Sequence, residues 1–172
     1  MAWNIDKSHT EVGFAVRHMM MMTVRGKFTS YDADIQMDPA NLAAAKVTAR
    51  IETKSVDTGE EKRDGHLRSA DFFDAEKYPA MTFTTTKLTR KGDDLEVTGT
   101  LKIKDQEHPL TLKGEVTGPG KDPWGNQRLG FSLSGEIDRE TWGLTWNQAL
   151  EAGGVLVAKK VKVVVEAQLI QS

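Results

Sequence analysis

The side chains best suited to acid–base or metal chemistry in this sequence are four histidines, His9, His18, His66 and His108. An imidazole titrates near neutral pH and binds metal ions readily, so each one is a candidate general base or ligand. Their spacing matches no His-Glu-x-x-His motif. The sequence also contains no cysteine, which excludes thiolate zinc sites, iron–sulfur clusters and cysteine nucleophiles. We expect each histidine to be a structural residue whose hydrogen bonds are satisfied.

Motifs that organise nucleophilic or phosphate chemistry are also missing from the sequence. We find no Gly-x-Ser-x-Gly elbow, no Gly-x-x-x-x-Gly-Lys-Ser/Thr loop and no Gly-x-Gly-x-x-Gly turn. Serines and aspartates occur, but no local pattern links them to a histidine. We therefore predict that the protein is not an enzyme and needs no metal ion or cofactor.

Two further groups of residues point to binding. Arg63 and His66 lie near Arg68 and Asp71, and a guanidinium there is suited to an anionic head group. The alternative is that these side chains tie a helix to neighbouring loops. The methionines at 19–22 place flexible apolar side chains on both faces of a strand. We expect them to form a gate at the mouth of the fold, a subunit interface, or an edge covered by a helical segment.

Strict alternation of apolar and polar residues predicts that nearly the whole chain is β-strand. One change of parity, between Phe28 and Tyr31, predicts a β-bulge near residues 29–30 that returns the apolar face to the interior. We expect about eight strands, over residues 12–16, 24–37, 47–51, 81–83, 95–103, 110–116, 129–137 and 161–169.

Short turn-forming stretches separate these strands. Examples are Lys91-Gly92-Asp93-Asp94, Gly118-Pro119-Gly120 and Gly153-Gly154. Short loops between long alternating strands indicate antiparallel hairpins, and one apolar face per strand requires the sheet to fold over itself. The sequence therefore predicts an all-β fold, an up-and-down barrel or a sandwich.

Residues 58–77 are the one segment without alternation. Thr58 and Glu61 match a capping box, which predicts a short helix over residues 60–67. Ser69 is placed to cap a second helical turn. We expect this helical insertion to cover one end of the barrel.

The inward faces of the strands indicate a hollow, apolar interior. Four glycines occupy positions of the strands where the alternation predicts inward-facing apolar residues: Gly26, Gly99, Gly114 and Gly135. Because glycine has no side chain to fill the interior, we expect the lumen to stay open. A sugar, nucleotide or amino acid would lose its water there without replacement. A hydrocarbon gains about 0.8 kcal/mol for each buried methylene. A ligand of this lumen should therefore be long and apolar.

The overall composition suits one globular domain, which we expect to span residues 1–172. Lys and Arg number 23 against 25 Asp and Glu, so no basic excess points to nucleic acid. No apolar run approaches the ~20 residues of a membrane-spanning helix. We therefore expect no integral membrane segment, and any contact with a membrane should be transient. The N-terminus shows no leader pattern, so we expect a cytoplasmic location as given, and a periplasmic one if a leader has been removed.

Several motifs together resemble the YceI family of bacterial polyisoprenoid-binding proteins. The motifs cover essentially the whole chain and include Trp3-x-Ile5-Asp6-x-x-His9, Val12-x-Phe14-x-Val16-x-His18, Arg63-Asp64-x-His66-Leu67-x-Ser69-x-Asp71-Phe72-Phe73-Asp74, Trp124-Gly125-x-x-Arg128 and Ile137-x-Arg139-x-x-Trp142-Gly143-x-x-Trp146. The resemblance implies an extended eight-stranded antiparallel, lipocalin-like barrel holding a long lipid, such as a polyisoprenoid, a quinone precursor or a fatty-acid derivative. It also implies a homodimer without established catalysis.

We therefore predict that the chain binds, stores or transports a long-chain lipid in the barrel lumen. Two alternatives stay open: an enzyme that acts on a bound prenyl or acyl lipid with His18 or His66 as general base, and a ligand-free dimeric stress-related protein with a filled lumen. Arg63 and His66 are the candidate head-group contacts. The predicted lumen residues are Phe14, Val16, His18, Met20, Phe28, Ile35, Ile51, Phe72, Phe73, Phe83, Leu101, Leu112, Phe131, Trp142 and Trp146.

Overall fold

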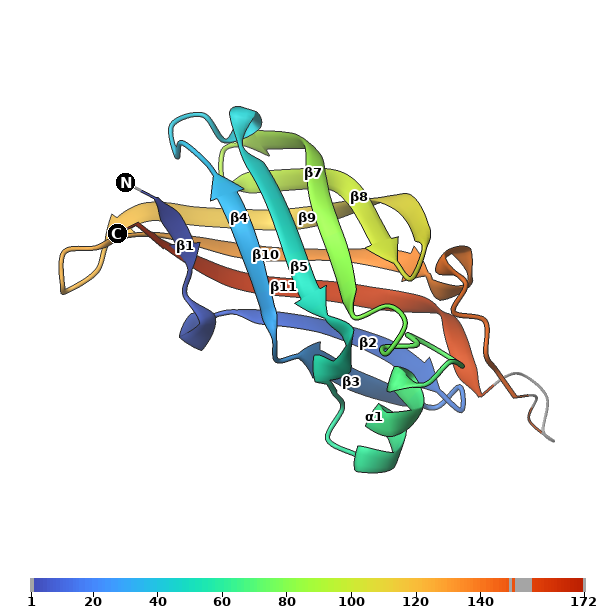
Figure 1. Cartoon of the computed structure of the whole chain (residues 1–172). Coiled ribbons are helices and arrows are strands. Elements are labelled where there is room, and N and C mark those ends of the chain that lie inside the picture. Colours follow the sequence, from blue (N-terminus) through green and yellow to red (C-terminus); the bar gives the residue numbers. More distant parts are fainter. Residues whose placement is uncertain (1, 149, 151–155, 172) are drawn as a thin grey trace.

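A computed structural model describes residues 2–148, 150 and 156–171, and these residues are mostly β-strand (Figure 1). The strands are β1 (Trp3–Ile5), β2 (Glu11–His18), β3 (Met22–Phe28), β4 (Tyr31–Gln36), β5 (Lys46–Glu52), β6 (Val56–Asp57), β7 (Ala80–Lys91), β8 (Asp94–Ile103), β9 (Gln106–Lys121), β10 (Gln127–Asp138) and β11 (Val157–Gln171). The helices are α1 (Glu61–Arg68) and the short 3₁₀ helices η1 (Lys7–His9), η2 (Leu42–Ala44), η3 (Thr53–Ser55) and η4 (Arg139–Trp142).

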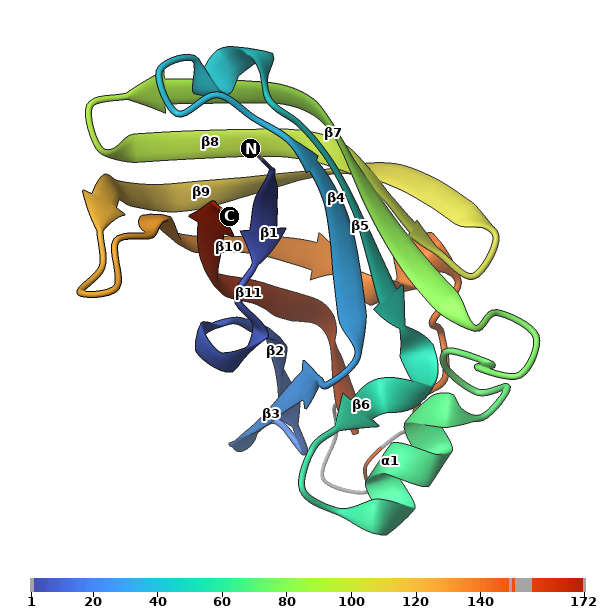
Figure 2. The same cartoon turned by 60° about the vertical axis from the view of Figure 1, so that its left-hand side comes forward.

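All strands of the described residues belong to one antiparallel sheet. Its order is β4-β5-β7-β8-β9-β10-β11-β2-β3-β6, and β1 pairs with β11. The sheet curls strongly, so that its two edges approach each other (Figure 2). Backbone hydrogen bonds join the edges at one corner, where Thr29 N donates to Ser55 O (3.2 Å) and Glu52 N donates to Ser30 O (2.9 Å). The all-β, antiparallel barrel class expected from the sequence is confirmed.

The number of strands differs from the expected eight. Residues 24–37 form two strands, β3 and β4, because the chain turns a corner at residues 29–30 where a bulge was predicted. Phe28 and Tyr31, on the two sides of the corner, are both buried, so the change of parity does return the apolar face to the interior. β1 and β6 account for the rest of the difference, since strands of three and two residues are too short to show alternation.

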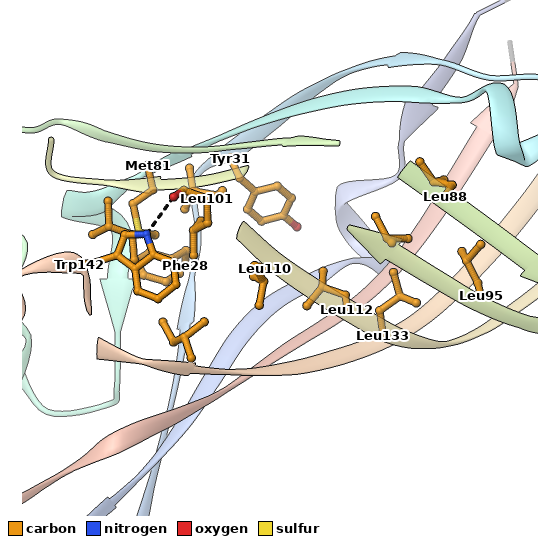
Figure 3. Close-up of a cluster of buried hydrophobic side chains, with 14 of the residues drawn as sticks. Phe28, Tyr31, Met81, Leu88, Leu95, Leu101, Leu110, Leu112, Leu133 and Trp142 are labelled. Atoms are coloured by element: carbon orange, nitrogen blue, oxygen red, sulfur yellow. Dashed lines mark hydrogen bonds between the residues drawn. The ribbon is translucent and has the colours of Figure 1, made fainter. Parts of the chain in front are cut away.

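Inward-facing side chains from β8, β9 and β10 form the most completely buried part of the core (Figure 3). Val116 and Leu129 are 0% and 1% exposed, and full burial of such a side chain stabilises the fold by about 1.5–3 kcal/mol. Trp142 packs at one end of this cluster, where its indole Nε1 donates a hydrogen bond to the carbonyl oxygen of Leu101 (2.8 Å; dashed in Figure 3). The largest group of buried core residues therefore lies along these three long strands.

The inward glycines do not leave open space, so that part of the prediction is wrong. A Cβ at Gly99 would lie 2.6 Å from the ring of Phe83, and one at Gly26 would collide with the ring of Phe14. Each ring therefore occupies the place of the missing side chain. At the other two positions, Gly114 and Gly135, a Cβ would collide with a backbone oxygen of a neighbouring strand. These glycines permit the close approach of strands.

Helix α1 occupies the predicted insertion, but its N-terminal contacts differ from a capping box. The backbone N and Oγ1 of Thr58 both donate to Oδ1 of the buried Asp64, at 2.9 and 2.5 Å. Residues after Ser69 form turns, in which Phe72 N donates to Ser69 O (3.0 Å) and Ser69 Oγ accepts a hydrogen bond from the backbone N of Asp71 (3.3 Å), as expected of a capped helical turn. Figures 1 and 2 place α1 at the end of the barrel opposite to the chain termini.

The predicted turns are found in part. Residues 91–94 contain the β7–β8 turn, as expected. Gly118, Pro119 and Gly120 instead lie within β9, and the β9–β10 turn follows at residues 122–126, where Asp122 Oδ1 accepts hydrogen bonds from two backbone N–H groups. Gly153 and Gly154 lie outside the described residues.

The methionines at 19–22 form the tip of the β2–β3 hairpin, and they do not lie on two faces of one strand. Met19 and Met20 have φ of +54° and +59°, the left-handed conformation, within the three-residue loop between the paired residues His18 and Met22. The four side chains are between 41% and 75% exposed. The alternative of an edge covered by the helical segment is therefore wrong, and so is the prediction that Met20 faces the lumen.

Candidate functional site: an apolar cavity in the barrel

A cavity of about 600 Å³ lies inside the barrel. Its wall is formed mainly by hydrophobic side chains that alternate along the strands, such as Val12, Phe14 and Val16 on β2 and Val161 and Val163 on β11. Protein sites for small ligands typically enclose about 300–1,000 Å³. The core residues therefore leave a space large enough for a ligand, and that space is lined by groups that offer few hydrogen bonds.

Thirteen of the fifteen residues predicted for the lumen lie on the cavity wall. They are Phe14, Val16, His18, Phe28, Ile35, Ile51, Phe72, Phe73, Phe83, Leu101, Leu112, Phe131 and Trp146. Two do not. Met20 projects from the hairpin tip, and Trp142 is buried in η4, where its ring packs 5.3 Å from that of His108. Trp142 anchors η4 to the barrel wall through its hydrogen bond to Leu101 and does not face the cavity.

Polar residues of the cavity wall at the α1 end include His18, Thr58, Glu60, Arg63 and His66, and others such as Thr10 and Thr85 lie elsewhere on the wall. Glu60 is exposed to solvent, so the cavity reaches the molecular surface there. We call this opening beside α1 the mouth of the cavity. The apolar interior and the polar mouth give the site two chemically different parts.

Arg63 lies at the mouth, but its guanidinium already has protein partners. Its Nε donates to Thr58 Oγ1 (2.7 Å), its Nη2 donates to the Thr58 carbonyl oxygen (2.9 Å), and its Nη1 lies 3.4 Å from a carboxylate oxygen of Glu60. These contacts fasten α1 to the preceding loop, as the structural alternative expected.

His66 is the mouth residue that joins the polar rim to the apolar wall. Its Nε2 lies 2.9 Å from a carboxylate oxygen of Asp71. Its ring packs edge-on against Trp146 and Phe72, with centroid distances of 4.5 and 5.1 Å. The histidine therefore holds two aromatic rings of the cavity wall in place while one of its nitrogens contacts a carboxylate.

Arg139 is a residue of the cavity wall that the sequence interpretation missed. It is 3% exposed, and its guanidinium donates to the carbonyl oxygens of Ala158 (2.8 Å), Val157 (3.2 Å), Trp146 (3.0 Å) and Leu144. Burial lowers the pKa of this guanidinium, which nonetheless stays protonated because arginine titrates so far above neutrality. Arg139 thus ties the segment after η4 to the start of β11.

The alternation of inward-facing residues along β10 could have identified Arg139 from the sequence. Leu129, Phe131, Leu133 and Ile137 occupy alternate positions on this strand, and residue 139 continues the same series. A charged residue at an inward position is expected to be buried and to need several hydrogen-bond partners. Following the alternation two residues further would have identified it.

A second group that the sequence interpretation missed lies near the chain termini. Arg128 Nη1 lies 2.6 Å from Asp6 Oδ2, and Arg128 Nε lies 2.8 Å from Asp122 Oδ2. The hydrogen bonds from Arg128 lower the pKa of Asp122 to about 2 and hold the pKa of Asp6 well below its usual range. This network fastens the N-terminal segment and the β9–β10 turn to β10.

The remaining histidines are structural groups, with one correction. His9 Nδ1 lies 2.7 Å from Asp6 Oδ2. His108 packs against Trp142, but its Nε2 is buried without a hydrogen-bond partner, so the expectation of full satisfaction is wrong there. Within the described residues, no group of three or more His, Asp or Glu side chains is arranged to hold a metal ion. No helix in that part of the chain combines the length and apolar character needed to span a bilayer.

Comparison with known proteins places the chain in a family. The family model of the YceI-like domain matches residues 3–169. A UPF0312 protein of Staphylococcus epidermidis is 40% identical over 161 residues, which cover 93% of this chain and 92% of that protein. Protein YceI of Escherichia coli O157:H7 is 42% identical over 137 residues, which cover 78% of this chain and 72% of that protein.

Solved structures share the fold. The crystal structure of the Campylobacter jejuni YceI protein superimposes with a TM-score of 0.78 at 33% identity, covering 100% of this chain and 99% of that one. A polyisoprenoid binding domain from Saccharophagus degradans superimposes with a TM-score of 0.71 at 16% identity, again over 100% of this chain and 99% of the other. Because the family model spans nearly the whole sequence and the relatives cover most of it, this chain belongs to the family of YceI-like domains.

Proposed function

We propose that the protein binds a long apolar lipid in its barrel cavity and acts as a carrier or reservoir without catalysis. The observation that carries the proposal is the cavity of about 600 Å³ whose wall is almost wholly hydrophobic. A polyisoprenoid, a quinone precursor or a fatty-acid-like chain matches that wall. The relation in fold to a polyisoprenoid binding domain supports the same ligand class.

The gain from burying a hydrocarbon chain is large enough to explain useful affinity. Each buried methylene contributes about 0.8 kcal/mol, so a segment of about ten methylenes contributes about 8 kcal/mol. That free energy corresponds to a dissociation constant of about 1 μM. A polar ligand of the same size would lose several kcal/mol of hydration without finding partners in the wall.

The polar residues at the mouth set the expected orientation of the ligand. A hydrocarbon end lies deep among Phe14, Phe83 and Phe131, and a polar head group lies near His18 and His66 at the α1 end. This arrangement leaves the head group in contact with water while the chain is buried. It requires no bond to be made or broken.

Mass spectrometry of the purified protein tests the proposal. The native complex is weighed, its organic extract is analysed, and the apoprotein is then incubated with prenyl and fatty alcohols. A stoichiometric long-chain species supports lipid binding, and an unchanged lipid mass after prolonged incubation supports binding without turnover. An apoprotein that takes up none of these lipids contradicts the proposal. Release of a cleaved lipid that His66→Ala abolishes would favour the enzyme alternative.

The homodimer expected from the family resemblance stays a prediction, as does the cellular compartment. Sedimentation equilibrium at several concentrations tests the oligomeric state. Fractionation of cells that express the native gene tests the location.

A further inference from the structure

The β2–β3 hairpin ends in a tip whose side chains are strongly exposed although they are apolar. We call residues 19–22 the methionine tip. Met20, Met21 and Met22 are 58%, 75% and 58% exposed. The backbone of the tip is held on both sides, since Met21 N donates to His18 O (3.3 Å) and Met19 N donates to Leu156 O (2.7 Å). The exposure is thus built into an ordered turn, and contiguous apolar surface of this kind commonly marks an interaction site.

Three basic residues lie on the outer face of the sheet near the methionine tip. Arg17 on β2 and Arg25 on β3 face outward, and Lys162 on β11 lies opposite Ala15 of β2 in the same outward row. All three are exposed. Within the described residues, none of the three side chains makes a hydrogen bond or ion pair. The carboxylate Glu136 of β10 lies opposite Lys162 and pairs with the nearby Lys160 (3.1 Å). Arg17 and Arg25, the cations on the hairpin itself, therefore lie beside the methionine tip with no ion-pair partner among the described residues.

The methionine tip also adjoins the mouth of the cavity. His18 precedes it directly and lines the cavity, and Val157, which pairs with His18, lines it too. Figures 1 and 2 show the β2–β3 hairpin and α1 at the same end of the barrel. The opening of the cavity, the methionine tip and the basic residues therefore lie near one another.

We propose that the methionine tip docks on an anionic lipid bilayer, with the methionine side chains among the acyl chains and Arg17, Arg25 and Lys162 against the anionic head groups. Apolar side chains flanked by Lys or Arg are typical of protein surfaces that bind the interface of an anionic bilayer. The docking itself does not depend on the proposed lipid binding. Its purpose, transfer of a lipid between bilayer and cavity, rests on that proposed function.

The charges favour a bilayer over a second copy of this chain at the same surface. A two-fold symmetric contact through the methionine tip would place the same basic residues of two chains near one another. Like charges brought together in this way oppose association. An anionic lipid surface neutralises them instead.

Cosedimentation with vesicles tests the docking. The full chain is mixed with vesicles of phosphatidylcholine alone and with vesicles that also contain phosphatidylglycerol. We expect binding to the anionic vesicles only, a loss of binding at high salt, and about tenfold weaker partition for Met20→Gln/Met21→Gln and for Arg17→Gln/Arg25→Gln. All four positions are exposed, so we expect these variants to keep the melting temperature of the native chain.

Matched controls separate docking from general effects of charge and apolarity. Trp124→Gln removes a large exposed side chain at the opposite end of the barrel, and Lys87→Gln/Lys102→Gln removes two exposed cations from β7 and β8. We expect both variants to bind anionic vesicles like the native chain. Native-like binding by the methionine variant, or equal loss in the control variants, would overturn the proposal.

Two further readouts distinguish the remaining outcomes. If Met20→Gln/Met21→Gln converts a dimer into a monomer in sedimentation equilibrium and leaves vesicle binding unchanged, the methionine tip is a subunit interface and the proposal is wrong. Lipid uptake by the cavity is measured separately by mass spectrometry. Vesicle binding without lipid uptake would support docking and contradict the proposed function. Lipid uptake without vesicle binding would support the proposed function and contradict docking.

Discussion

Filling the cavity with one larger side chain should weaken lipid binding by an amount that the wall geometry predicts. Ala49 on β5 faces the lumen beside Ala33 of β4, and both line the cavity. Ala49→Leu adds three carbon atoms to that wall. If they displace about three methylenes of the ligand, the loss is about 2.4 kcal/mol, or roughly 50-fold in the dissociation constant.

The neighbouring residue supplies a control on the same strand. Thr48 is exposed on the outer face of β5, so Thr48→Leu adds apolar atoms outside the barrel. Titration of each apoprotein with one fatty alcohol gives the dissociation constants, and urea denaturation checks that each variant is folded. We expect Thr48→Leu to bind like the native chain. A folded Ala49→Leu variant with native affinity would refute the placement of the ligand in this lumen.

Three other changes test the contacts of the cavity wall and of the network near the chain termini. Arg139→Met removes four hydrogen bonds to carbonyl oxygens and should lower the free energy of unfolding in urea by about 3 kcal/mol; a loss below about 1 kcal/mol would contradict the role assigned to it. The aspartates paired with Arg128 have lowered pKa values, so their stabilisation is present above about pH 4 and is lost as the pH falls towards 2. As the pH is lowered between these values, the urea concentration at the midpoint of unfolding should fall less steeply for Arg128→Gln than for the native chain. The same dependence on pH in both proteins would contradict this. Trp146 lines the cavity, so ligand binding should change its fluorescence; Trp146→Phe should abolish that change, and Trp124→Phe should preserve it.

The barrel and most of its lumen could be predicted because strand alternation is a local pattern. Phe14, Ile35 and Leu112 were placed on the inner wall from their parity alone, and they lie there. The alternation along one strand does not indicate which side chains of the neighbouring strands contact a given residue. Gly99 shares the inward parity, yet the ring of Phe83 covers it, and only the packing of two neighbouring strands determines that contact.

Turn geometry and long-range pairs were harder to predict. Methionine is not a residue that favours positive φ, so nothing in the composition of residues 19–22 indicated a hairpin tip. Asp6 and Arg128 are 122 residues apart in sequence, and their ion pair depends on β1 and β10 both pairing with β11. Such contacts follow from the closed arrangement of the sheet and have no local signature.

The most direct test of lipid binding is the dependence of affinity on chain length. A series of straight-chain alcohols is titrated into the apoprotein, and the dissociation constant is measured for each. A hydrocarbon buried in the cavity predicts about a fourfold gain in affinity for each added methylene, from about 0.8 kcal/mol apiece, until the cavity is full. An affinity that does not change with chain length would contradict binding in the lumen.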